Sequence, residues 1–158
     1  MRIIVISDTH RDFRTLHRIV EKHREEAAMF LHLGDGEQEV DDLLALYPEL
    51  PLLAVRGNCD FSEEYPESRV AVAGNTRIFM AHGHDLGVKG STGVLVRLAR
   101  ENGCRIALYG HTHKSDTHYE EGIYVMNPGS PSMPRDGRAS YGIIDITGAG
   151  IVTFVVEI

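Results

Sequence analysis

The 158-residue sequence has few cysteines, no long apolar run and no long basic run, and each absence excludes a class of protein. Cys59 and Cys104 are the only cysteines, which is too few for a disulfide framework and favours a reducing compartment. No stretch approaches the roughly 18 apolar residues that a membrane span needs, and the first ten residues lack the apolar length and cleavage site of a signal peptide. We therefore expect a cytoplasmic protein without membrane association.

The formal net charge is −7 at pH 7. Proteins that bind long stretches of nucleic acid neutralise its phosphates with Lys and Arg, so extended contact with DNA or RNA is not expected. No repeat, low-complexity segment or linker interrupts the chain, and residues 1–158 are predicted to form one domain. An acidic protein can still bind a single phosphate group where metal ions make the site locally positive.

The first third of the chain alternates between apolar β-branched runs and helical patterns. The strands are predicted at residues 2–6, 29–33 and 52–55, and the helices at 12–26 and 37–47. Asp12 is the expected N-cap of the first helix, and Pro48 follows the end of the second. Because strand–helix–strand connections of this kind join parallel neighbours, this region predicts a parallel sheet with crossover helices.

The remaining two thirds of the chain are richer in short strands. Gly74-Asn75 between two alternating runs is a strong hairpin signal. The predicted strands are 69–73, 76–81, 105–109, 115–120, 123–126, 141–146 and 151–157, and one further helix is predicted at 91–101. The whole pattern predicts an α/β fold in which two sheets stack and helices cover their outer faces.

Side chains of the types that bind metal ions follow five of the predicted strands. In chain order they are Asp8, His10, Asp35, Asn58, His82, His84, His111 and His113. In open α/β sheets, ligands bind beyond the carboxyl ends of the strands, so these five loops are expected to converge on one edge. We expect the two segments of the pattern D-x-H and H-x-H to be extended, so that alternate side chains point the same way.

This residue set suits a pair of metal ions. One carboxylate must bridge the ions, and Asp35, in the tight Gly34-Asp35-Gly36 turn, is the natural candidate. The positive charge of two divalent ions exceeds the negative charge of two aspartates and a bridging hydroxide by about +1. This net charge favours binding of a phosphate ester anion. Mixed imidazole, carboxylate and amide ligands favour Mn, Fe, Co, Ni or Zn over Mg or Ca.

Taken in order, these motifs resemble those of the calcineurin-like metallophosphoesterases. The family pattern of D-x-H, G-D, G-N-H-[DE], H and G-H-x-H corresponds here to Asp8-Thr9-His10, Gly34-Asp35, Gly57-Asn58-Cys59-Asp60, His82 and Gly110-His111-Thr112-His113. The match spans nearly the whole chain. The short length and the segment Asn127-Pro128-Gly129-Ser130 resemble the minimal, uncapped bacterial and archaeal branch of phosphodiesterases.

The resemblance implies a four-layer αββα sandwich of two mixed sheets and a division of the ligands between two divalent transition-metal ions, with Mn and Ni foremost among the metals. The first ion would take Asp8, His10, Asp35 and His113, and the second would take Asp35, Asn58, His82 and His111. The expected reaction is in-line attack by a hydroxide that bridges the ions, with Asn58 and the histidines orienting the ester.

Cys59 stands where relatives that cleave phosphomonoesters rapidly carry a histidine that protonates the leaving group. A neutral thiol is a poor proton donor, so we expect the substrate to be a small phosphodiester. His84 is the candidate to replace the missing acid, and its alternatives are support of the ligands or plain exposure to solvent. Two other functions stay open: a phosphomonoesterase using the same site, and a non-catalytic interaction module like the small phosphoesterase-like subunit of the retromer coat.

Other residues are interpreted structurally. Cys59 is expected to be partly buried, and His17 and His23 to lie at the surface or boundary of a helix. His32 is expected to pack or to hydrogen-bond near the ligand loops. Arg56 and Arg138 are assigned to the surface, with phosphate contact as the alternative. Substrate specificity is expected to depend on the loops at 59–68, 83–92 and 128–138, and exposed hairpins such as 69–81 could pair two copies of the chain.

Overall fold

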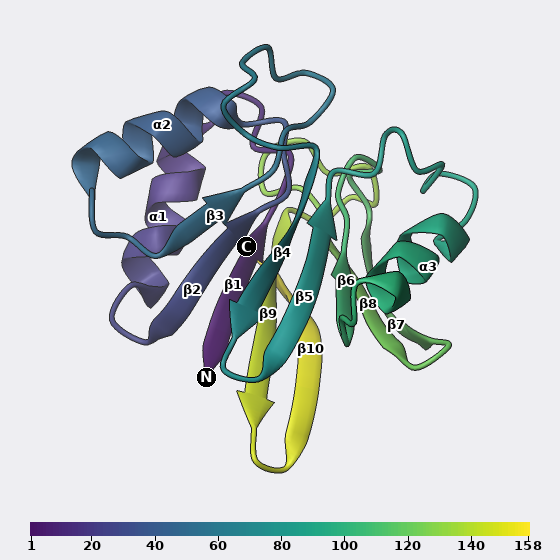
Figure 1. Cartoon of the computed structure of the whole chain (residues 1–158). Helices are drawn as coiled ribbons and strands as arrows, with labels where there is room; N and C mark the ends of the chain where they lie inside the picture. Colours follow the sequence, from purple (N-terminus) through teal and green to yellow (C-terminus); the bar gives the residue numbers. More distant parts are fainter.

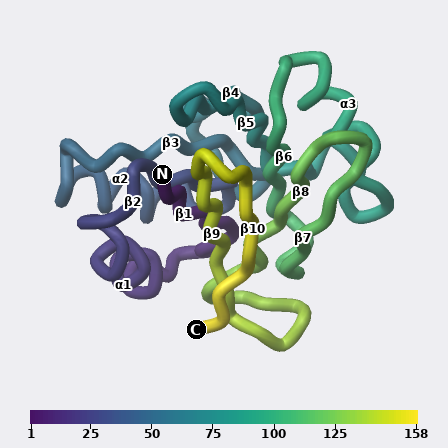
Figure 2. Tube along the Cα trace, turned by 90° about the horizontal axis from the view of Figure 1, so that it is seen from below, coloured from purple at the N-terminus to yellow at the C-terminus, as the bar shows by residue number.

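Two five-stranded sheets stack face to face in the computed structural model, which describes residues 1–158 (Figure 1). Helices α1 and α2 cover the outer face of one sheet, and α3 covers the outer face of the other. Figure 2, viewed from below, shows the same order of layers, with α1 and α2 on one side of the strands and α3 on the other. This arrangement confirms the four-layer αββα sandwich.

The elements follow the predicted order closely. The helices are α1 (Phe13–His23), α2 (Glu37–Leu46) and α3 (Gly93–Glu101). The strands are β1 (Arg2–Ile6), β2 (Ala27–His32), β3 (Leu52–Ala54), β4 (Ser68–Ala73), β5 (Thr76–Ala81), β6 (Ile106–Leu108), β7 (Ser115–Glu120), β8 (Ile123–Pro128), β9 (Ser140–Thr147) and β10 (Gly150–Glu157). Asp12 caps α1 as expected, because its carboxylate accepts the backbone N–H of Thr15 at 3.0 Å.

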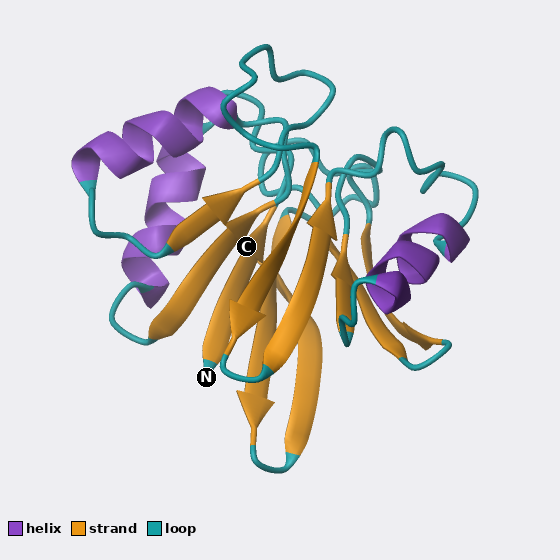
Figure 3. Cartoon of the chain, viewed as in Figure 1, coloured by secondary structure: helices purple, strands orange, loops and turns teal.

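Both sheets are mixed. The first has the order β10-β9-β1-β2-β3, in which β1, β2 and β3 are parallel and the β9–β10 hairpin is antiparallel to them. The second has the order β4-β5-β6-β8-β7, in which β5, β6 and β8 are parallel and the edge strands β4 and β7 are antiparallel to their neighbours. The parallel strands of both sheets end toward the same side of the molecule, where the loops gather (Figure 3).

Three apolar clusters hold the four layers together. The central one joins the two sheets and contains fully buried side chains from both, such as Ile3 and Val5 on β1 and Ile78 and Met80 on β5. A second cluster packs α3 on its sheet, and a third packs α1 and α2 on the other. The apolar run at residues 3–6 of β1 is required because both faces of this part of the strand are covered.

Several predicted boundaries differ from the structure by one to three residues, and two of the differences have a clear cause. Helix α1 ends at His23 rather than at residue 26, because Ala27 already pairs with Arg2 in the β1–β2 ladder and must be extended. Strand β8 runs two residues longer than predicted, to Pro128, because Ser115 of β7 pairs with it. Of the three helices, none is both long enough and apolar enough to cross a membrane.

Candidate metal centre

The five loops that follow β1, β2, β3, β5 and β6 meet at the carboxyl ends of the strands, as expected for ligand sites in α/β sheets. The ligand atoms of Asp8, His10, Asp35 and His113 all lie within 4.8 Å of one another. His82 joins this group through its Nε2, which lies 3.4 Å from Asp35 Oδ2 and 3.9 Å from Asp8 Oδ1. Residues up to 105 positions apart in the sequence therefore form one cluster.

The Asp8 carboxylate has two oxygens with different surroundings. Its Oδ2 accepts the Ser7 hydroxyl at 2.5 Å and the His111 backbone N–H at 3.0 Å, which fixes the orientation of the group. Its Oδ1 is buried, has no hydrogen-bond donor, and lies 3.1 Å from His113 Nε2. A buried carboxylate oxygen without a donor is costly, and a cation at this point would satisfy it.

Asp35 is held in the same way. Its Oδ1 accepts the backbone N–H of Cys59 at 2.8 Å, and its Oδ2 lies 3.6 Å from His10 Nε2 and 3.4 Å from His82 Nε2. The free oxygen of Asp35 is thus placed between two histidines that belong to different loops.

Backbone carbonyls fix the tautomers of two histidines. Nδ1 of His82 lies 2.7 Å from the Leu33 carbonyl, and Nδ1 of His113 lies 2.7 Å from the Met133 carbonyl. Because a carbonyl oxygen only accepts, each Nδ1 must carry a proton, and Nε2 is then the atom that faces the cluster with its lone pair whenever the ring binds a metal. Histidines that bind metal ions are oriented by this kind of hydrogen bond. The donor set therefore fits a divalent metal ion.

The second part of the cluster is more open. Asn58 is exposed, and its Oδ1 lies 3.0 Å from His82 Nε2. The His111 ring is half-buried, with its centroid 5.1 Å from that of His82. His84 is half-buried beside both rings, at centroid distances of 5.5 Å and 6.2 Å, and its buried Nδ1 has no hydrogen-bond partner. All eight side chains that the sequence singled out are thus brought together.

The backbone of these loops differs from what the sequence predicted. The D-x-H and H-x-H segments are not extended, because Asp8, His10, His111 and His113 all have φ between 42° and 66°. Of the seven non-glycine residues with positive φ, only Glu121 lies outside the loops of this site. Such conformations are unfavourable for residues with a Cβ and concentrate at functional sites, where the surrounding structure enforces them. The side chains converge through left-handed turns rather than through β alternation.

Two glycines of the motifs are required by close packing. A Cβ on Gly57 would collide with the backbone and carboxylate of Asp35, and a Cβ on Gly110 would collide with the side chains of Ser7 and Asp8. Both positions lie against a metal-ligand candidate from another loop. The G-N and G-H motifs therefore require glycine because neighbouring loops pack too closely to leave room for a Cβ.

The electrostatics of the cluster favour ionised carboxylates. Burial by itself raises the pKa of Asp8, but the close imidazoles of His10 and His113 outweigh it and hold the pKa far below its ordinary value. Burial likewise opposes ionisation of Asp35, whereas the close imidazole of His82 lowers the pKa overall. For His111, burial and then the neighbouring His82 lower the pKa, which keeps the imidazole neutral and able to bind a metal.

Asp60 organises the site in a way that the sequence reasoning missed. Its two carboxylate oxygens accept backbone N–H groups from four residues, at distances between 2.7 and 3.1 Å, and these are Asp35, Gly36, Glu37 and Gly57. One carboxylate thus joins the loop after β2, the start of α2 and the loop after β3. Its place in the Gly57-Asn58-Cys59-Asp60 motif was the available signal.

Two side chains differ from the prediction in their burial, and one agrees with it. Cys59 is exposed, contrary to prediction, because only its backbone is drawn inward by Asp35. His23 is also buried, contrary to prediction: its Nε2 lies 2.8 Å from the hydroxyl of core Tyr141. His32 is buried as expected, with Nε2 3.1 Å from the Thr9 hydroxyl.

The two arginines considered for phosphate contact are paired elsewhere. Arg56 binds Glu67 at 2.7 Å and Arg138 binds Glu157 at 2.5 Å, so both have surface roles.

Arg11 was overlooked, although it directly follows His10. It is exposed, and its guanidinium makes no ion pair or hydrogen bond within the chain. The free arginine at the site is therefore Arg11.

The family comparison agrees with this geometry. Residues 1–149 match the calcineurin-like phosphoesterase superfamily domain. The chain belongs to this family. The probable metallophosphoesterase YsnB of Bacillus subtilis is 32% identical over 148 residues, which cover 92% of this chain and 85% of that protein. Family membership and the Asp/His cluster together indicate that this phosphoesterase domain binds divalent metal.

Solved structures share the fold over nearly the full chain. A predicted phosphoesterase from Streptococcus pneumoniae has a TM-score of 0.82 and 28% identity, and the alignment covers 98% of this chain and 97% of that one. A structure described as a novel archaeal phosphodiesterase has a TM-score of 0.77 at 22% identity and covers 99% of this chain and 100% of that one. Zn²⁺-bound Vps29 from Entamoeba histolytica has a TM-score of 0.73 at 23% identity and covers 99% of both chains. The last two likenesses show the fold alone.

Proposed function

We propose that this protein hydrolyses small phosphodiesters at a centre of two divalent transition-metal ions. The observation that carries the proposal is the convergence of ligand atoms in a largely buried cluster, where Asp8 Oδ1, which has no hydrogen-bond partner, faces Asp35 Oδ2 and His113 Nε2. Such an arrangement is unfavourable without a cation, and this donor set suits Mn or Ni foremost, with Fe, Co and Zn as alternatives. The exposed free thiol of Cys59 supports a reducing compartment, so we place the protein in the cytoplasm.

The two ions would be divided between the buried and open parts of the cluster. Asp8, His10, Asp35 and His113 would hold the first, and Asp35, Asn58, His82 and His111 would hold the second, with Asp35 bridging. Ions held there supply a water nucleophile at neutral pH and offset the negative charge of the phosphoryl oxygens. The position of Asp35 Oδ2 between His10 and His82 supports the bridging role.

The residues around the open part would bind and orient the ester. Asn58 presents an exposed amide at the point where the phosphate enters. Arg11 adds a free guanidinium beside His10, suited to a non-bridging phosphoryl oxygen. His84, half-buried beside His82 and His111, is the side chain that we propose to donate a proton to the leaving oxygen. The attacking and leaving groups would then lie in line across the phosphorus.

The preference for diesters rests on Cys59. The loss of some hydration and the nearby carboxylate of Asp35 raise the pKa of this exposed thiol, so it releases its proton less readily and is a poor acid toward an alkoxide. The net charge of the centre also matters, because a monoester dianion needs more compensation than a diester monoanion. Hydrolysis of bis-p-nitrophenyl phosphate at a greater kcat/KM than p-nitrophenyl phosphate is the expected result, and the reverse order would favour a phosphomonoesterase.

The main test combines metal analysis with turnover. Wild-type protein loaded with Mn²⁺ or Ni²⁺ should hydrolyse bis-p-nitrophenyl phosphate, whereas Asp35→Ala and Asn58→Ala should abolish this activity and keep the far-UV circular dichroism of the folded chain. Asp116→Asn, on β7 and away from the cluster, is the matched control and should retain activity. Full activity in Asp35→Ala or Asn58→Ala would overturn the assignment.

The non-catalytic alternative has a distinct outcome. An interaction module of the retromer-subunit type would bind metal weakly, or it would bind metal but hydrolyse no monoester or diester with any of several metals. The complete set of eight polar residues at the strand ends supports catalysis instead.

The role of His84 has its own test. His84→Gln should lower kcat by about 100-fold for a diester with a poor, alkoxide-like leaving group and by far less for a p-nitrophenyl ester, whose leaving group needs no proton. Equal losses on both substrates would assign His84 to support of the ligands.

A further inference from the structure

A cleft of ≈ 710 Å³ opens directly beside the candidate metal centre, between the start of α1, the first turns of α2 and the loop after β3. Two of the candidate metal ligands, His10 and Asp35, are among the residues that line it. Phe13 and Phe61 line the same cleft. A group bonded to a phosphorus at the metals could therefore extend into this cleft without leaving the protein surface.

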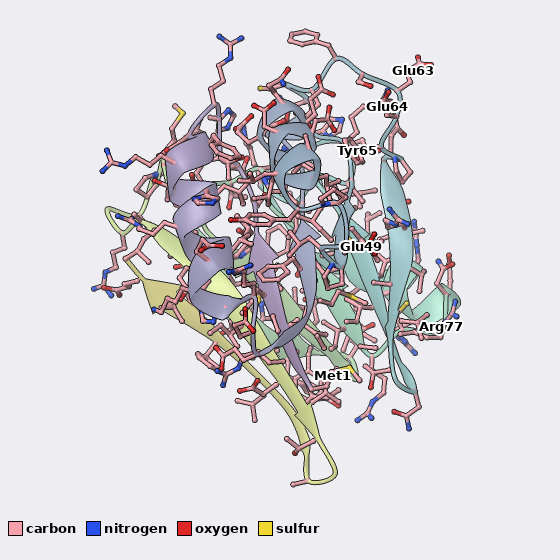
Figure 4. All side chains as sticks on the ribbon, turned by 90° about the vertical axis from the view of Figure 1, so that its left-hand side faces the viewer. Met1, Glu49, Glu63, Glu64, Tyr65 and Arg77 are labelled. Atoms are coloured by element: carbon pink, nitrogen blue, oxygen red, sulfur yellow. The ribbon has the colours of Figure 1, made fainter.

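Phe61 is the most exposed large apolar side chain of the molecule, at 88% of its full exposure. Its backbone is nevertheless fixed, because the carboxylate of Glu37 accepts the N–H groups of Phe61 and Ser62 at 2.8 and 2.9 Å. Tyr65, labelled on the same loop in Figure 4, adds a bond of 2.6 Å from its hydroxyl to Asp41 on α2. The exposed ring is thus presented by a loop that α2 holds in place. The ring itself buries little apolar surface and adds little to the stability of the chain.

The second aromatic ring has a rigid backing. Phe13 is half-buried and stacks on His17, at a centroid distance of 5.6 Å, and His17 stacks in turn on Tyr47 at 5.8 Å. The cleft therefore has one backed ring and one free ring, which together can contact a planar group by stacking or edge-to-face packing. Cys59 adds a polarisable sulfur to the lining of the same cleft.

The charge of the cleft disfavours a second anionic group. Besides Asp35, four carboxylates line it, from Glu37, Glu39, Asp42 and Asp60. The first two and Asp60 accept backbone N–H groups, and Asp42 accepts the side-chain amide of Gln38 at 3.0 Å, so their role is structural but their charge remains. Arg11 is the only Lys or Arg of the lining, and it adjoins His10 at the phosphate end.

We propose that this cleft is a subsite for a neutral aromatic ester group of the substrate, packed against Phe61 and Phe13. The proposal rests on the proposed function, since it names the substrate class of the same centre: a phosphodiester in which one ester group is an uncharged planar ring, such as an aryl or nucleobase-bearing group. Substrates with a further phosphate or carboxylate on that group are disfavoured by the acidic wall. Phe61 determines specificity, and it takes no part in the chemistry.

The test measures binding of phosphonates, which the centre does not hydrolyse. Isothermal titration of the Mn²⁺- or Ni²⁺-loaded protein should give a Kd for phenylphosphonate about tenfold lower than for methylphosphonate. 4-Carboxyphenylphosphonate should bind more weakly than phenylphosphonate. Phe61→Ala should reduce the preference for phenyl over methyl to about twofold or less and leave the Kd of methylphosphonate unchanged.

Tyr119→Ala is the matched control, because Tyr119 is an exposed ring, at 64%, on β7 and outside the cleft. It should keep the full preference. Equal affinity for phenyl and methyl, absence of measurable phenylphosphonate binding, a preference that survives Phe61→Ala, or tighter binding of the carboxylated ligand would each overturn the subsite.

The two proposals fail separately. A phenyl preference without diester turnover would refute the proposed function and keep an aromatic subsite beside a metal centre. Diester turnover without a phenyl preference would refute the subsite alone.

Discussion

Two clusters in this molecule combine histidine with carboxylates at hydrogen-bonding distance, and they differ in what they can bind. At the strand ends, Asp8, Asp35 and three histidines direct ligand atoms toward one another. On β7, His118 lies between Asp116 and Glu120, with Nδ1 2.7 Å from one carboxylate and Nε2 2.9 Å from the other. The residue types are the same, but in the second cluster both ring nitrogens already have a partner.

The difference comes from the backbone. Residues 116, 118 and 120 lie on the same face of a regular strand, because side chains two positions apart point the same way. The His118 imidazole therefore lies between the two carboxylates, and its two nitrogens point in different directions. At the strand ends, left-handed turns direct side chains from separate loops toward a common point, and backbone carbonyls of Leu33 and Met133 occupy the outward nitrogens. The residue types of a cluster therefore do not by themselves create a metal site. The decisive features are converging lone pairs and a tautomer fixed from outside.

The largest effect should come from replacing one histidine of each cluster with glutamine and comparing the two variants. His113→Gln removes an Nε2 that faces Asp8 Oδ1, and we expect metal affinity to fall by at least about 100-fold, with a parallel loss of diester turnover. His118→Gln should change neither quantity. Titration with Mn²⁺ or Ni²⁺ measures the affinities, and equal effects in the two variants would remove the distinction between the clusters.

A second comparison uses two carboxylates that accept backbone N–H groups. Asp60→Ala leaves four N–H groups at the site without an acceptor and should lower the free energy of unfolding by about 3 kcal/mol. It should also weaken metal binding by about 10- to 100-fold, because the loop that carries Asp35 loses its support.

The matched control for Asp60 is Asp136, which accepts the N–H and hydroxyl of Ser115 beside β7. Asp136→Ala should lower stability in urea and keep metal affinity. A metal affinity that is unchanged in Asp60→Ala would show that the ligand loops hold their geometry independently.

Metal binding should stabilise the folded chain only through the first cluster. At a free metal concentration 100 times the Kd, the free energy of unfolding should rise by about 2.7 kcal/mol, and a chelator should reverse the change. Thermal unfolding with and without EDTA measures it. The rise should persist in His118→Gln and disappear in His113→Gln, and the opposite pattern would place the metal on β7.

The smallest effect concerns the pH dependence of the β7 cluster. Burial lowers the pKa of His118, but hydrogen bonds to Glu120 and Asp116 outweigh it and raise the pKa overall. A raised folded pKa stabilises the chain fully below the unfolded pKa of about 6.5, and this contribution is lost as pH rises through the higher folded pKa.

His118→Gln should therefore destabilise the chain more at pH 5.5 than at pH 9. The difference should be below about 1 kcal/mol, because the His118 side chain is about one-third exposed. Urea unfolding at the two pH values measures it, and a larger loss at pH 9 would contradict the assigned ionic partners.

Much of the fold could be predicted because its patterns are local. The apolar run of β1, the Asp12 cap and the Gly74-Asn75 hairpin each act within a few residues, and each is confirmed. The end of α1 was missed because it depends on a partner strand: Ala27 is extended only because Arg2 lies beside it. The burial of His23 was missed for a similar reason, since Tyr141 is 118 residues away.

For the site, the positions of the motifs along the chain were enough to predict which side chains meet. Metal-binding residue types stand directly after apolar strands, and parallel strands bring their carboxyl ends to one edge. The geometry in which they meet depends on the packing of the folded chain. The left-handed backbone of the ligand loops, the four bonds of Asp60 and the presentation of Phe61 by Glu37 all depend on contacts between separate loops. Such contacts leave no periodic trace in the chain, because each is set by the packing of segments that are distant in sequence.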